Sequence, residues 1–218
     1  MFSISKATLS DRAHAELQSR ILAGRLVAGR KILPEAVAAD MSISPTPVRE
    51  AMLRLANDGL IEGNSRKRMV VRKYTFRDIE ELCSARLLVE TDALATAFRN
   101  SRVDDSFLDR MQAIVDRQGR IANSHAHGDI FEFIGADSYF HSEIVSLGCN
   151  ALISRWHRVT MLQMQAVCID KHRNFSAGPS RDEHFDILSA MRRNDPVEAD
   201  RCLRSHIENE NSRILVNM

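Results

Sequence analysis

The sequence has few of the features that mark secreted, disulfide-bonded or membrane-spanning proteins. Its 218 residues include four cysteines, and no two of them form a C-x-x-C pair. Neither a zinc ribbon nor a disulfide framework is therefore indicated, and we expect reduced thiols in a cytosol. The N-terminus has no apolar signal-peptide core, and no stretch approaches about eighteen consecutive apolar residues. These absences predict a cytoplasmic protein that does not span a membrane.

Charge is distributed unevenly along the chain. Residues 1–74 contain 13 Lys and Arg against 7 Asp and Glu, whereas residues 75–218 contain 17 against 22. The overall charge of +1 hides this difference between a basic first part and an acidic second part. A basic half is typical of a protein that meets a polyanion such as nucleic acid. We therefore expect two domains, 1–74 and 75–218, of which the first contacts a polyanion.

The first domain is expected to contain short helices. Apolar residues recur at helical spacing from about residue 11 until Gly24, and a second helix is expected over 35–41. For the third helix the sequence predicts that Thr46 caps the start and that Pro47 takes the first helical position. The apolar stripe of this helix is expected to consist of Val48, Met52 and Leu55.

A β-hairpin is expected next. Two short apolar runs, Leu60-Ile61 and Met69-Val70-Val71, are separated by a polar and basic segment. Two short helices followed by such a hairpin are the pattern of a winged helix-turn-helix, whose second helix enters the major groove. A basic run by itself is more often a solvated surface than a DNA contact. The prediction that this run contacts DNA therefore depends on the two helices before it. The tip residues expected to neutralise phosphates or enter the minor groove are Arg66, Lys67 and Arg68.

The second domain is expected to be an all-helical bundle. Apolar residues keep helical spacing from Ile79 onwards, and no alternating strand pattern follows residue 75. The fold class is therefore mainly α, with an N-terminal winged helix-turn-helix, a small β-hairpin wing and a C-terminal helical bundle. After a first helix around Ile79 to Val89, the further helices are expected over 105–122, 129–147, 150–170, 181–193 and 196–215.

Four side chains of the second domain form a candidate metal site. Asp137 and His141 are four residues apart, so on a helix both project from one face. His184 and His206 lie on mostly apolar sides of two later helices, and a bundle can bring such ligands together at its centre. One carboxylate and three imidazoles suit zinc, nickel or manganese and leave positions open for a ligand carboxylate. Buried histidines are more often hydrogen-bonded core residues, and a dimerisation bundle with such a core is the alternative.

Residues 33–61 resemble the signature of the GntR family of bacterial regulators, above all in the run Thr46-Pro47-Val48-Arg49-Glu50-Ala51. The resemblance implies that Arg49 reads bases and that Ser44 and Thr46 contact the backbone or bases at the helix start. Arg49 could equally be a surface salt-bridge partner, although its place in the first turn of the second helix favours the groove.

The chain departs from the family pattern in three places. Pro45 stands where the family usually has Arg, and one residue is missing between Glu35 and Val37. The wing lacks its customary glycine, whose place is taken by Lys67 or Arg68. The operator sequence therefore cannot be carried over from relatives.

Residues 76–215 resemble the FCD ligand-binding domain of the FadR-type branch, in its shorter, six-helix, VanR-like version. The resemblance rests on Arg86-x-x-x-Glu90, Asp137-x-x-x-His141, Glu183-His184 and His206. It implies that Asp137, His141, His184 and His206 bind one divalent transition metal ion per chain, with zinc or nickel preferred over manganese. It also implies that Arg86 binds an effector carboxylate beside the metal. The alternative role of Arg86 is an ion pair with Glu90.

These features predict a transcription repressor. A homodimer would place two recognition helices on a palindromic double-stranded DNA operator, and a small carboxylate effector would control operator affinity. A metal-dependent hydrolase is the alternative from another class. No nucleophile motif or general base stands out, however, and an enzyme leaves the first 74 residues unexplained. We therefore expect that the chain is not an enzyme.

Overall fold

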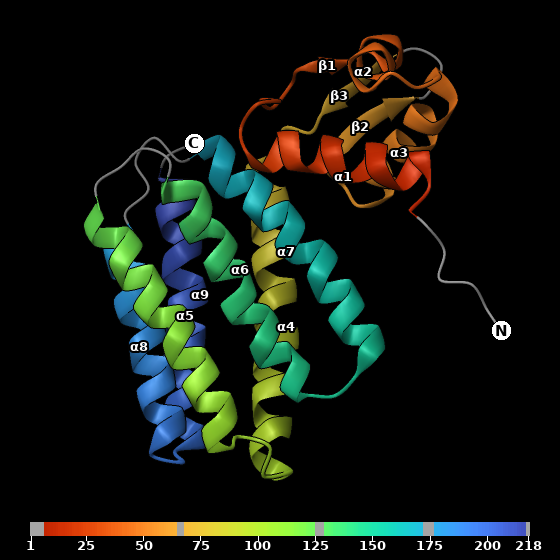
Figure 1. The fold of residues 1–218 in the computed structure, drawn as a ribbon. Helices are drawn as coiled ribbons and strands as arrows, with labels where there is room; N and C mark the ends of the chain where they lie inside the picture. Colours follow the sequence, from red (N-terminus) through yellow and green to blue (C-terminus); the bar gives the residue numbers. More distant parts are fainter. Residues whose placement is uncertain (1–6, 65–67, 125–128, 172–176, 217–218) are drawn as a thin grey trace, which may run out of the picture. The chain divides into compact units, whose positions relative to one another are not determined.

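The computed structural model describes residues 7–64, 68–124, 129–171 and 177–216 (Figure 1). The chain divides into two compact units, residues 1–73 and 74–218. Within the described residues, the first unit combines helices with a small antiparallel sheet and the second consists of helices alone. The predicted fold class, mainly helical with a winged helix-turn-helix and a helical bundle, is confirmed.

The first unit is built on a three-helix core. Helix α1 starts with a capping box, in which the Thr8 hydroxyl accepts from the Asp11 N–H and the Asp11 carboxylate accepts from the Thr8 N–H. Ser42 ends α2 in the left-handed conformation at φ 54°. Helices α1 and α2 both pack against α3. The helices of this unit are α1 (Leu9–Leu22), α2 (Pro34–Met41) and α3 (Pro45–Asn57).

Helix α3 begins two residues earlier than the sequence predicted. Its N-cap is Ser44 and its first residue is Pro45, so the expectation that Thr46 caps and Pro47 opens the helix was wrong. Both prolines fit because the first N–H groups of a helix have no partner inside it. The predicted stripe of Val48, Met52 and Leu55 is confirmed, because all three are buried.

The sheet has one strand more than expected. Strands β2 (Ile61–Asn64) and β3 (Arg68–Val71) pair antiparallel with Ile61 opposite Val71, which confirms the predicted hairpin. Strand β1 (Lys31–Ile32) pairs with the other edge of β3, giving the order β1-β3-β2. A strand of two residues shows no alternation, so periodicity could not reveal it.

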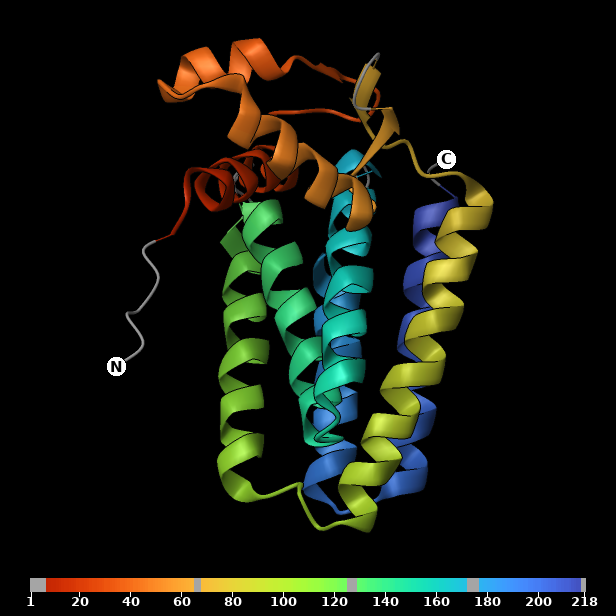
Figure 2. The same cartoon turned by 90° about the vertical axis from the view of Figure 1, so that its right-hand side faces the viewer.

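The second unit is a bundle of helices that lie side by side along one direction (Figures 1 and 2). Helix α4 packs against α6, α7 and α9, while α5 lies between α6 and α8. None of the helices in the described part of the chain is long and apolar enough to cross a bilayer. The helices of the second unit are α4 (Phe76–Arg99), α5 (Asp105–Ser124), α6 (Asp129–Leu147), α7 (Ala151–Lys171), α8 (Ala177–Arg192) and α9 (Pro196–Leu215).

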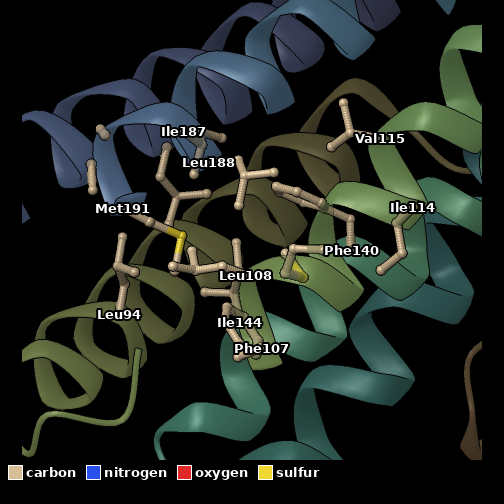
Figure 3. Close-up of a cluster of buried hydrophobic side chains, with 14 of the residues drawn as sticks. Leu94, Phe107, Leu108, Ile114, Val115, Phe140, Ile144, Ile187, Leu188 and Met191 are labelled. Atoms are coloured by element: carbon tan, nitrogen blue, oxygen red, sulfur yellow. The ribbon is translucent and has the colours of Figure 1, made fainter. Parts of the chain in front are cut away.

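An apolar core holds α4, α5, α6, α8 and α9 together. Figure 3 shows Leu94, Phe107, Phe140 and Met191, from four different helices, pointing toward one another. Burial of such side chains stabilises a fold by about 1.5–3 kcal/mol each. Phe140 also stacks on the ring of His184, with 4.0 Å between ring centroids. The buried His184 therefore lies directly against the apolar core.

Candidate metal centre and DNA-reading surface

Four buried side chains from three helices converge in the middle of the bundle. Asp137 and His141 come from α6, His184 from α8 and His206 from α9, and one ligand atom of each lies within 4.8 Å of all the others. The Nε2 atoms of His141 and His184 are each 3.1 Å from Nε2 of His206. Asp137 Oδ1 is 3.5 Å from Nε2 of His184. These separations suit four ligands that each lie about 2.0–2.2 Å from one ion.

Each of the three histidines turns its other nitrogen away from this centre. Nδ1 of His141 lies 2.6 Å from a Glu90 oxygen, and Nδ1 of His206 lies 2.8 Å from a Glu183 oxygen. Nδ1 of His184 lies 2.9 Å from Oε1 of Gln118. A carboxylate or amide oxygen only accepts, so Nδ1 must carry the proton in each ring. The three Nε2 atoms therefore face one another as lone pairs.

The carboxylate of Glu90 connects the histidines to a second buried group of charges. Its Oε1 accepts from Arg86 Nε at 2.9 Å and lies 3.0 Å from Nε2 of His157 on α7. Arg86 Nη1 donates to Glu210 of α9, while Arg86 Nη2 has no hydrogen-bond partner among the described residues. Because Gln118 belongs to α5, all of the helices from α4 to α9 contribute to this network.

Burial sets the protonation of the centre. It lowers the pKa of His141 to about 4 and, with the neighbouring His206, that of His184 well below its ordinary value. Both rings are therefore neutral near pH 7, as metal ligands must be. Burial and the nearby Glu210 carboxylate raise the pKa of Asp137 well above its usual range. Burial opposes the charge of Glu210, but the guanidinium of Arg86 lowers its pKa to about 2.

The chemistry of this centre fits a divalent cation. Among the described residues, the buried carboxyl and guanidinium groups are Arg86, Glu90, Asp137 and Glu210, with a charge of −2 when all are ionised. A buried excess charge is costly unless it is compensated. The Nε2 lone pair of His206, 3.1 Å from Nε2 of both His141 and His184, also repels theirs unless a cation lies between them. A divalent ion would supply both the missing charge and the missing electron-pair acceptor.

The sequence found the four converging residues but not the side chains that hold them. Asp137 and His141 followed from their spacing, whereas Gln118 and Glu183 had no assigned role. His157, which the sequence did not single out, is a further buried partner of Glu90. The ion pair of Arg86 with Glu90, the alternative to effector binding, is present in the structure. Effector binding by Arg86 stays a prediction.

The predicted DNA-reading residues of α3 lie on its exposed side. Ser44, Thr46 and Arg49 are exposed, opposite the buried stripe of the helix. The Arg49 guanidinium forms an ion pair with Glu35 of α2, so a surface salt bridge, the alternative to base reading, is present, with a partner that the sequence did not indicate. On the wing, Arg66 and Lys67 lie outside the described residues. Arg68 is the first residue of β3.

Two family models match these two units. The model for bacterial regulatory proteins of the gntR family matches residues 9–71, and the model for the FCD domain matches residues 81–209. The chain therefore belongs to the GntR family of DNA-binding transcription regulators, in the FadR-type branch with a C-terminal FCD domain. This family consists of regulators rather than enzymes, which confirms the expectation that the chain is not an enzyme.

Individual relatives resemble the chain over nearly its whole length. The gluconate operon transcriptional repressor of Bacillus licheniformis is 27% identical over 200 residues, which cover 88% of this chain and 79% of the relative. The transcriptional repressor NanR of Klebsiella aerogenes is 24% identical, with 94% and 85% covered. A GntR transcriptional regulator from Rhodococcus sp. RHA1 has the same fold, with a TM-score of 0.82, 23% identity and 95% and 97% coverage.

Proposed function

We propose that this chain is a metal-dependent repressor whose affinity for DNA is controlled by a small organic acid. The observation that carries the proposal is the convergence of Asp137, His141, His184 and His206 in the bundle core, with their lone pairs directed at one point. The bound ion, with zinc or nickel preferred over manganese, would offer an open position to a carboxylate. Arg86 would bind that carboxylate beside the ion, because its Nη2 has no hydrogen-bond partner among the described residues.

The DNA-binding part of the proposal assigns roles to exposed residues of the first unit. Arg49 reads a base edge, while Ser44 and Thr46, at the start of the helix, contact the DNA backbone or bases. The wing residues Arg66, Lys67 and Arg68 supply charge toward phosphates. A homodimer would present two copies of α3 to a palindromic operator.

Acid binding would act through a shift between two conformations of the dimer. An acid that binds more tightly to the conformation with poor DNA affinity depopulates the DNA-binding one. The name of one relative, a gluconate operon transcriptional repressor, suggests sugar acids as first candidates for the effector. The acid can be identified by mass spectrometry of what co-purifies with the protein.

The Arg49→Ala variant tests the DNA-binding part. Duplexes selected from a random pool by the unaltered protein are titrated in fluorescence anisotropy. Loss of one base-reading arginine is expected to weaken binding by about 1–3 kcal/mol and to reduce discrimination at one position of each half-site. Arg54→Ala is the control, because Arg54 is also an exposed, ion-paired arginine of α3 but lies in its last turn. Equal effects of the two variants would remove Arg49 from the recognition mechanism.

A further inference from the structure

The orientation of the three histidines depends on side chains that are not metal ligands themselves. Each Nδ1 is paired with an oxygen from a different helix, Glu90 on α4, Gln118 on α5 and Glu183 on α8. Without such an acceptor a neutral histidine can carry its proton on either nitrogen. Only the form protonated on Nδ1 has an Nε2 lone pair that can bind a metal.

We propose that Glu90 and Gln118 are positioning residues of the metal site, which hold His141 and His184 in the tautomer and orientation that bind the ion. The inference rests on the metal site in the proposed function. Partners of this kind commonly contribute about 10- to 100-fold to metal affinity. Both residues are fully buried, at 0% exposure, so water cannot replace them as acceptors.

Glu90 is itself held in a single orientation. Arg86 Nε donates to its Oε1, and Arg86 cannot lose its proton. The second oxygen, Oε2, is thereby left to face Nδ1 of His141. Arg86 is bound in turn to Glu210, so the guanidinium is fixed between two carboxylates. The hydrogen bond from Arg86 Nε therefore fixes Glu90, and Glu90 in turn faces the ligand His141 on α6.

The Glu90→Gln variant should reverse the tautomer of His141. The amide oxygen of the new side chain must face the Arg86 donor, which turns its NH₂ group toward Nδ1 of His141. The ring must then accept at Nδ1 and carry its proton on Nε2, where the ion would bind. Glu210→Gln is the matched control. It removes the same charge from a buried carboxylate but keeps an amide oxygen that can accept from Arg86 Nη1, so Arg86 still holds Glu90. Among the described residues, Glu210 has no hydrogen bond to a ligand histidine.

Gln118→Leu offers a test that changes no charge. Its Oε1 accepts from His184, while its Nε2 has no hydrogen-bond partner among the described residues. Gln118→Leu therefore removes little apart from the acceptor for Nδ1. Gln118→Glu keeps an acceptor oxygen at the same place and should therefore bind the metal as the wild-type protein does. This pair still gives an answer if Glu90→Gln fails to fold.

The probe is Co²⁺, added to full-length metal-free protein whose folding is verified by circular dichroism. Dissociation constants are measured by competition with a chelator, and the visible absorption of bound Co²⁺ reports coordination geometry. We expect Glu90→Gln and Gln118→Leu to weaken binding by about 10- to 100-fold and to alter the spectrum. Glu210→Gln and Gln118→Glu should keep the wild-type spectrum.

Two outcomes would overturn the inference in different ways. If Glu90→Gln matches Glu210→Gln and Gln118→Leu matches the wild type in affinity and spectrum, the positioning roles are wrong while the metal site stands. If the wild-type protein itself takes up no Co²⁺, the metal site of the proposed function fails and the positioning roles fail with it.

Discussion

At the scale of single residues, the pairing of Arg49 with Glu35 has a consequence for DNA binding. Both side chains are exposed, to 49% and 62%, and an exposed ion pair contributes only about 0–1 kcal/mol. DNA phosphates can therefore compete for Arg49 at little cost. Glu35 nevertheless places a negative charge beside the proposed base-reading arginine, and this charge repels any DNA backbone that approaches.

The Glu35→Gln variant should bind DNA more tightly but less selectively. Removal of the carboxylate frees Arg49 for phosphates of any sequence, so affinity for random duplex DNA should rise. The slope of log affinity against log salt concentration should steepen by about 1, the value for one added phosphate contact. Asp40→Asn is the control, since Asp40 is also exposed on α2 but pairs with Arg20. If both variants raise affinity equally, total charge alone explains the effect.

Residue patterns predicted the four converging side chains of the candidate metal site better than the residues around them, and the reason is physical. Asp137 and His141 lie one helical turn apart, so a local rule places them on one face. Glu90 and His141 are 51 positions apart, and Gln118 and His184 are 66 apart. Such pairs meet only because of how the helices pack, which periodicity does not determine.

At the scale of elements, the metal site would connect three helices that are separated in the chain. Asp137 and His141 belong to α6, and the two other ligands belong to α8 and α9. A metal that binds only the folded protein stabilises it by mass action. Binding at this site should therefore strengthen the bundle as a whole and not one helix alone.

Thermal unfolding can measure this stabilisation. With Zn²⁺ at about 100 times its Kd, the free energy of unfolding should rise by about 2.7 kcal/mol, which corresponds to roughly 5–10 °C in Tm for a domain of this size. Asp137→Asn removes the anionic ligand and should abolish the increment, whereas His14→Asn, a histidine change in the first unit, should preserve it. An equal increment in the Asp137→Asn variant would place the stabilising metal elsewhere.

The sequence predicted elements according to their length and periodicity. Most of the long amphipathic helices of the bundle were expected close to their observed bounds, but α4 continues to Arg99 where residues up to Val89 were expected, and α8 starts at Ala177 where 181 was expected. Strand β1 was missed because two residues carry no pattern, and the start of α3 was misplaced because Pro45 and Pro47 both suit a first turn. The sequence therefore fails to predict an element that is too short to have a periodic pattern, and it misplaces a helix start where two positions suit the first turn equally well.

At the scale of the whole molecule, the proposed control by an acid has a thermodynamic consequence. If acid binding weakens DNA binding by some factor, DNA must weaken acid binding by the same factor. Typical couplings of this kind are about 5- to 150-fold. The relation holds whatever movement connects the two sites, so it tests the coupling without assuming a mechanism.

The acid that co-purifies with the protein provides the measurement. Its Kd is determined by calorimetry on metal-loaded protein with and without a saturating selected duplex, and the Kd of the duplex is determined with and without the acid. We expect the two ratios to agree and to exceed about 5. The Arg49→Ala variant should bind the duplex weakly. At the same duplex concentration, its Kd for the acid should therefore equal the Kd measured without DNA. An acid that binds equally well in both states would be a resident ligand of the bundle and not a signal, because a ligand without differential affinity shifts no equilibrium.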